Sequence, residues 1–169
     1  MTTAAELTDP KREDSPIDEL FRNLVLRDVR IVKWCGEVSA DGEAIAEVRL
    51  LPVNGSYLLD YPRVACRFDQ TVDLSDADGR RLSSISVGII VDFHMAHDVA
   101  VITPDLDKAI GEHLLPGAWE IAYPYVREAV HTMSTRLGLD AVALGLLDRT
   151  ELHPQDVHVR GVAEFRGTG

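Results

Sequence analysis

Two runs of alternating apolar residues, separated by a short acidic turn, constrain the fold of this chain most strongly. The apolar residues share one parity from Val64 to Leu74, and they share one parity again from Ile85 to Phe93. Alternation with a period of two places all such side chains on one face of a strand. Between the runs, Asp76-Ala-Asp-Gly79 supplies the residues that a tight turn requires. The sequence therefore predicts a long antiparallel hairpin with one apolar face.

Shorter extended segments precede this hairpin. Residues 24–34 are rich in Val, Ile and Leu, which favours a strand, and the glycines of residues 36–42 are predicted to end it. An extended run restarts over residues 47–51. Turn-forming residues within 52–62 then bound one further short piece.

The main helix is predicted to begin near Tyr123, because Pro124 lacks an N–H and suits the first turn, where amides have no partners. Gly138 is predicted to end the helix in a left-handed conformation. Between these points the apolar residues follow a helical period, which favours a helix with one buried stripe. The stripe consists of Val126, Ala129, Val130, Met133 and Leu137.

A shorter helix is predicted to begin at Thr103-Pro104 and to run to His113, and a second, weaker helical segment falls within residues 144–152. Strands followed by segregated helices indicate an α+β domain with an antiparallel sheet. Residues 1–18 are polar and acidic, which is typical of a disordered tail. We expect the folded domain to cover residues 19–152 and a flexible tail to cover residues 153–169.

Composition excludes several classes of partner. The chain has 28 acidic and 17 basic side chains and a formal net charge of −11, so it should repel nucleic acid and anionic membranes and attract basic polypeptides. No apolar run approaches the length of a membrane span or the core of a signal peptide, which predicts a cytosolic protein. Cys35 and Cys66 lack metal-binding spacing and are predicted to be buried thiols.

No catalytic motif stands out. His94, His97 and Asp98 lie close together in the sequence and would form a metal site if a helix presented both imidazoles, but at a strand end the two point to opposite faces. A small α+β enzyme or ligand-binding domain that uses this cluster is therefore the alternative hypothesis. We predict no enzyme activity, no metal and no cofactor.

The main helix and its sequel resemble a known family. The motif Tyr123-Pro124-Tyr125-Val-Arg127-Glu128, together with the apolar connector that follows the helix as far as Leu144, is similar to the SecB family of export chaperones. The similarity is greatest to the SecB-like members that accompany toxin–antitoxin pairs. Leu26-Arg-Asp28 resembles the family's first strand, and Glu47-Val-Arg-Leu50 resembles the start of its second strand.

This resemblance implies a four-stranded antiparallel sheet with a crossover loop, one long helix packed on a face of the sheet, and a homotetramer built as a dimer of dimers. It also implies that the chain holds unfolded polypeptides without ATP. A holdase needs exposed apolar area that accepts many sequences. Transferred to this chain, the family's client groove consists of Val48, Leu50, Met133, Leu137, Leu139, Val142 and Leu144; for each of them, packing in the core is the alternative interpretation.

The resemblance leaves the partners open. Asp28 matches one acidic position through which the family docks the translocase motor SecA, whereas two other such positions fall on Val32 and Ser86. The clients implied are preproteins on their way to export, or one dedicated client such as an antitoxin.

Overall fold

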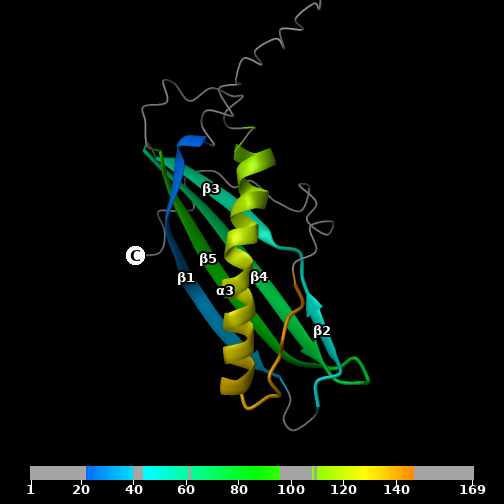
Figure 1. Cartoon of the computed structure of the whole chain (residues 1–169). Helices are drawn as coiled ribbons and strands as arrows, with labels where there is room; N and C mark the ends of the chain where they lie inside the picture. The colour runs from blue at the N-terminus through cyan, green and yellow to red at the C-terminus, as the bar shows by residue number, and fades with distance from the viewer. Residues whose placement is uncertain (1–21, 40–43, 61, 96–107, 109, 147–169) are drawn as a thin grey trace, which may run out of the picture.

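The computed structural model describes residues 22–39, 44–60, 62–95, 108 and 110–146 (Figure 1). Most of these residues form an antiparallel sheet and one long helix that lies across a face of the sheet. In chain order the elements are β1 (Leu24–Val38), β2 (Glu47–Leu50), β3 (Asn54–Asp60), β4 (Arg63–Ser75), β5 (Arg81–Met95), the π-helical turn η1 (Ile110–Leu114) and α3 (Leu115–Arg136).

The predicted hairpin forms the centre of the sheet. β4 and β5 pair antiparallel along almost their whole lengths, with Phe68 opposite Ile89, and Gly79 adopts a φ of 78° in the turn between them. β1 pairs with the other side of β5, and β2 pairs with the other side of β4. Between Val38 and Glu47 the chain therefore passes from one edge of the sheet to the opposite edge, which is the expected crossover.

The fourth position of the sheet is divided between two strands. β2 pairs with the end of β4 and β3 pairs with its beginning, so five strands occupy the four positions that the family resemblance implies. Pro52 lies in the gap and has no N–H to contribute to a ladder. The buried side chain of Gln70 fills this gap by donating to the carbonyls of Leu51, at 2.6 Å, and Thr71, at 2.9 Å.

β1 is longer than predicted, because it continues through Gly36 to Val38. Gly36 does not break the strand; it allows the strand to approach the end of α3. A Cβ atom at Gly36 would lie 2.7 Å from Cδ1 of Leu137 and 2.9 Å from Cγ of Met133. The glycine therefore serves close packing rather than a turn.

The main helix begins eight residues earlier than predicted, at Leu115 instead of Tyr123. Pro116 occupies its first turn, whereas Pro124 lies within the helix, where a proline costs roughly 3 kcal/mol. Trp119 and Tyr123, in the turn before Pro124, are both buried, and each such side chain contributes roughly 1.5–3 kcal/mol. Packing against the sheet therefore offsets the hydrogen bond that Pro124 cannot make.

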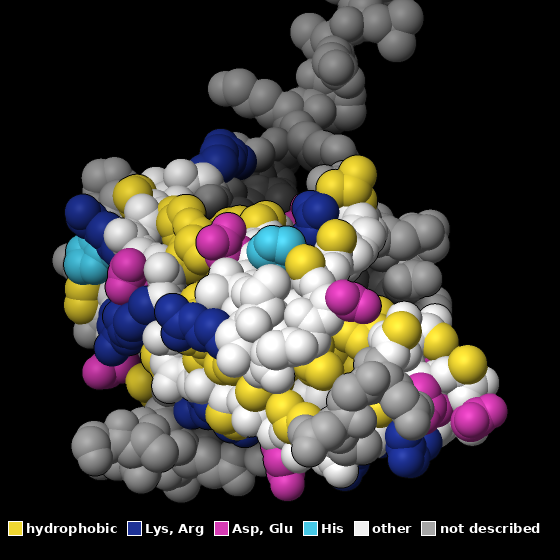
Figure 2. Space-filling model, turned by 90° about the horizontal axis from the view of Figure 1, so that it is seen from below, with side chains coloured by type: hydrophobic (Ala, Val, Ile, Leu, Met, Phe, Trp, Pro, Cys, Tyr) yellow, Lys and Arg dark blue, Asp and Glu magenta, His cyan; other side chains and the backbone are white. Residues whose placement is uncertain are grey.

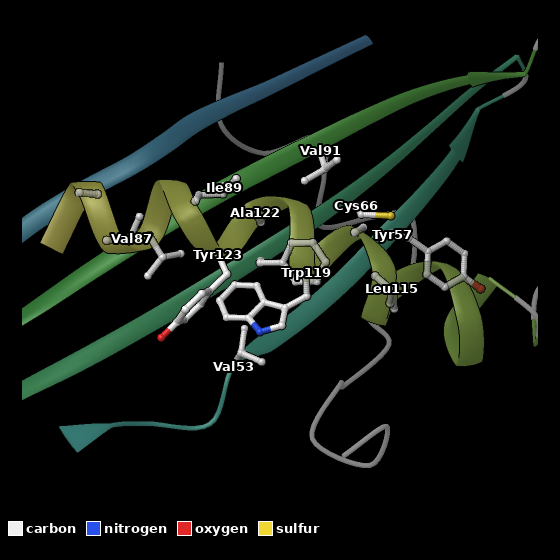
Figure 3. Packing of buried hydrophobic residues seen from close by; sticks show 14 of the residues in the cluster. Val53, Tyr57, Cys66, Val87, Ile89, Val91, Leu115, Trp119, Ala122 and Tyr123 are labelled. Carbon is white, nitrogen blue, oxygen red and sulfur yellow. The ribbon is translucent and has the colours of Figure 1, made fainter. Parts of the chain in front are cut away.

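The core lies between α3 and the sheet face that carries the alternating apolar residues (Figure 3). Trp119 is its centre: its ring lies 5.3 Å from the ring of Phe68 on β4 and 5.6 Å from the ring of Tyr123, measured between centroids. Val53, from the gap between β2 and β3, closes the same cluster. We call this side of the sheet the helix face and the other side the opposite face.

Several predicted features lie outside the described residues. These are the tails 1–18 and 153–169, the start of the helix expected at Thr103-Pro104, and the part of the weaker helical segment beyond Leu146. Residues 144–146 themselves are not helical. None of the described helices is both long and apolar enough to span a membrane.

Candidate functional site

The chain turns back along α3 after the helix ends. Gly138, with a φ of 74°, makes the predicted left-handed turn, and the backbone N–H of Leu139 donates to the carbonyl of Ser134 at 3.0 Å. Residues 139–146, which we call the connector, then run antiparallel to the helix without regular secondary structure (Figure 1). The connector therefore belongs to the helix face of the sheet.

Side chains of α3 hold the connector by its backbone. The hydroxyl of Tyr123 donates to the carbonyl of Gly145 at 3.1 Å, and Nε of Arg127 donates to the carbonyl of Leu144 at 2.9 Å. Nδ1 of His131 lies 3.3 Å from the carbonyl oxygen of Val142. The backbone N–H of Val142 in turn donates to Oγ of Ser134 at 3.0 Å.

Two apolar side chains of the connector are buried by this arrangement. Val142 and Leu144 keep 5% and 4% of their surface exposed and belong to the core, whereas the alternating Ala141 and Ala143 are exposed. Detachment of the connector from α3 would expose these two side chains, whose burial contributes roughly 1.5–3 kcal/mol each to stability. It would also break hydrogen bonds worth about 0.5–1.5 kcal/mol each. The connector is therefore held firmly against α3. Val142 and Leu144 pack in the core, which is the alternative interpretation given above for the groove residues.

Other members of the predicted groove reach the surface. Val48 and Leu50 on β2 are 39% and 42% exposed, although they pair with Leu74 and Val72 and therefore point to the helix face. Met133, Leu137 and Leu139 are partly buried and pack against the core. Seen from below, this end of the molecule shows apolar side chains at the surface among charged ones (Figure 2).

One acidic residue lies beside these apolar residues. Asp140, at the start of the connector, is exposed. Glu47 and Arg49 on β2 are also exposed, but they alternate with Val48 and Leu50 and therefore both point to the opposite face. The chain as a whole carries a formal net charge of −11. An extended apolar segment with basic flanks would complement this charge.

The opposite face of the sheet carries a network of ion pairs. Asp92 is nearly buried and is held by Arg63, through bonds of 2.6 and 2.9 Å, and by Arg30 at 2.7 Å. The hydrogen bond to Asp92 raises the pKa of Arg63 and outweighs the effect of desolvation. Asp28, the matched motor-docking position, lies 3.1 Å from the same Arg30. Its carboxylate is therefore already partly neutralised by the chain's own arginine.

The remaining motif residues have different surroundings. Tyr123 is buried and Arg127 is partly buried, and both contact the connector. Pro124, Tyr125 and Glu128 are exposed on α3. The motif thus combines two residues that hold the connector with three that face away from the core.

The cysteines and the proposed metal cluster do not form a site in the described part of the chain. Cys66 is buried, but Cys35 is exposed, which corrects the prediction that both are buried. Cys35 pairs with Ser86 in the register of the edge strand, on the face that α3 does not cover. His94 lies on β5, whereas His97 and Asp98 lie outside the described residues, and the described residues contain no metal-binding cluster of three or more His, Cys, Asp or Glu.

Comparisons with known proteins identify the fold. No protein-family model matches the sequence, and no curated protein sequence matches it significantly. Among solved structures, the chain is similar to a SecB-like chaperone of Mycobacterium tuberculosis, solved in complex with a ChAD peptide from an antitoxin. The two share 18% sequence identity with a TM-score of 0.64, over 79% of this chain and 96% of the other. The chain therefore has the SecB-like fold that the motif implied.

Proposed function

We propose that this protein is an ATP-independent chaperone that holds non-native polypeptides. The observation that carries the proposal is the exposure of Val48 and Leu50 on the face of the sheet that forms the core. The two side chains lie on the same face of a strand at the edge of the sheet, and exposed apolar patches commonly mark interaction sites. The SecB-like fold and the peptide bound to the similar chaperone support the same function.

The client surface in this proposal consists of Val48 and Leu50 with the partly buried Met133, Leu137 and Leu139. Each contact of this kind contributes roughly 1.5–3 kcal/mol at most, and ordering of the client cancels part of it. Repetition of the surface in a homotetramer, a dimer of dimers, would raise the overall affinity for a long client. Exposed Leu26 and Ile31 on β1, which is an edge strand of the sheet that the described residues form, support association between copies.

We favour a dedicated client such as an antitoxin over general export of preproteins. The similar chaperone was solved with an antitoxin peptide. Docking of SecA would use Asp28, whose carboxylate is paired with Arg30, and neither Val32 nor Ser86 supplies a second charge. In this proposal the protein acts in the cytosol, as a binding protein and not as an enzyme.

An aggregation assay tests the proposal. A fourfold excess of the protein should suppress the aggregation of an unfolded client without ATP, and the double variant Val48→Asp/Leu50→Asp should lose most of this effect. Val25→Asp is the matched control, because Val25 is 44% exposed but lies opposite His94, on the other face. Normal aggregation in the presence of the folded wild-type protein would refute the proposal.

A further inference from the structure

Three side chains of α3 form a row of donors along the connector, and the spacing of two of them, Arg127 and His131, matches that of an extended chain. Tyr123, Arg127 and His131 are four residues apart in the helix, which places neighbours about 6 Å apart along its axis. An extended chain covers about the same distance in two residues. The step from His131 to Arg127 accordingly corresponds to the step from the carbonyl of Val142 to that of Leu144.

The row recognises backbone atoms and not side chains. Its three acceptors are the carbonyl oxygens of Val142, Leu144 and Gly145. These bonds fix the path and the rotation of the connector, so that alternate side chains point into the core or away from it. The path that they set also determines where Leu139, at the start of the connector, lies relative to β2.

We infer that Tyr123 and Arg127 are positioning residues for the client surface. They hold the connector as one side of that surface, where the connector runs between α3 and the β2 strand that carries Val48 and Leu50 (Figure 1), and they act on a client through the connector. This inference rests on the proposed chaperone function and adds residues to it that are not themselves apolar. It also gives Tyr123 and Arg127, the buried and the partly buried residue of the Tyr-Pro-Tyr-x-Arg-Glu motif, the same function.

The test compares variants that remove one donor each. Tyr123→Phe removes only the hydroxyl, and Arg127→Met removes the donor while keeping an aliphatic side chain. Arg136→Met is the matched control, because it removes the same charge from the same helix, and the Arg136 guanidinium lies 4.6 Å from the Trp34 ring and not against the connector. Arg127→Lys keeps a charged donor and serves as the rescue variant.

Three measurements separate positioning from a merely structural role. Hydrogen exchange of residues 139–146 reports whether the row holds the connector. Thermal unfolding reports stability, which should fall to a similar extent in Arg127→Met and Arg136→Met. The affinity for a permanently unfolded, carboxymethylated test protein should fall between about threefold and tenfold in Tyr123→Phe and Arg127→Met, but not in Arg136→Met.

The outcomes are distinguishable. Faster exchange of the connector with weaker client binding, and recovery of both in Arg127→Lys, would support the inference. Faster exchange with unchanged affinity would overturn the inference while leaving the chaperone function intact. A wild-type protein that binds no unfolded test protein would overturn the proposed function and this inference together. Unchanged exchange in every variant would show that the row does not hold the connector.

Discussion

The indole Nε1 of Trp34 on β1 donates a hydrogen bond of 3.1 Å to the backbone carbonyl of Ala129 in α3. The guanidinium of Arg136, two turns further along the helix, lies over the same indole ring. One aromatic residue thus joins the edge strand to the last turns of the helix, close to the point where Gly36 permits their approach. This contact adds to the core packing around Trp119 in holding α3 over the sheet.

Replacement of Trp34 by phenylalanine should destabilise the protein by about 1 kcal/mol, because the hydrogen bond to Ala129 is lost while most of the apolar contact remains. Chemical denaturation measures this free energy of unfolding. Arg136→Ala is a useful companion, since it removes the cation over the ring and leaves the hydrogen bond in place. Equal stability of wild type and Trp34→Phe would show that the bond contributes nothing to the fold.

Two glycines near the ends of α3 should respond to alanine in opposite directions. Gly138 has a φ of 74°, which an alanine adopts only at a cost, so Gly138→Ala should destabilise the protein by about 1 kcal/mol. Gly117 lies within α3, and a Cβ atom there would meet nothing within 4 Å. Gly117→Ala should therefore stabilise the protein by about 0.5–1 kcal/mol. Thermal unfolding of both variants checks the signs; a shift in the same direction would contradict the helix bounds.

The two thiols should differ in reactivity. Burial, together with the nearby charge of Asp92, raises the pKa of Cys66 from 9.0 to about 12, whereas Cys35 is exposed. A thiol reagent at neutral pH should therefore modify Cys35 in the native protein and Cys66 only after unfolding. Peptide mapping of the modified protein identifies the site. Rapid modification of Cys66 in the native state would show that the core opens readily.

The raised pKa of Cys66 predicts that the protein loses stability at alkaline pH. Below about pH 9 the thiol of Cys66 is neutral in both the folded and the unfolded state, so the pKa difference costs nothing. Between pH 9 and about 12 the unfolded chain ionises while the folded chain does not, which favours unfolding. Unfolding free energies measured over this window should fall less steeply in Cys66→Ala than in the wild type. Parallel pH profiles would contradict this assignment.

Local patterns predicted those parts of the fold that local chemistry determines. The alternating runs and the turn at Gly79 specified the central hairpin, and Gly138 specified the end of α3. The start of α3 was mispredicted because Pro116 and Pro124 both suit a first turn. The sequence does not show that packing around Trp119 extends the helix on the N-terminal side of Pro124, as far as Leu115.

The candidate site was predicted only in part for a similar reason. The family resemblance placed Val48 and Leu144 in one groove, but the structure exposes the first and buries the second. The burial of Leu144 is secured by the donors at Tyr123, Arg127 and His131, whose acceptors are backbone carbonyls. Every residue has a backbone carbonyl, so the residue types of the connector do not indicate which of them accepts these hydrogen bonds.

The contrast between two leucines of the connector provides the last prediction. Leu144 is 4% exposed and lies in the core, so Leu144→Asp should leave a buried charge and reduce stability by roughly 2–5 kcal/mol or more. Leu139 is only partly buried, and an aspartate there can reach water. Leu139→Asp should therefore preserve the fold and weaken client binding roughly tenfold, because an apolar contact with the client is lost. Unfolding measured by circular dichroism and binding of a labelled unfolded client distinguish the two effects. If Leu139→Asp unfolds the protein while Leu144→Asp does not, Leu139 belongs to the core and Leu144 to the client surface, contrary to our assignment.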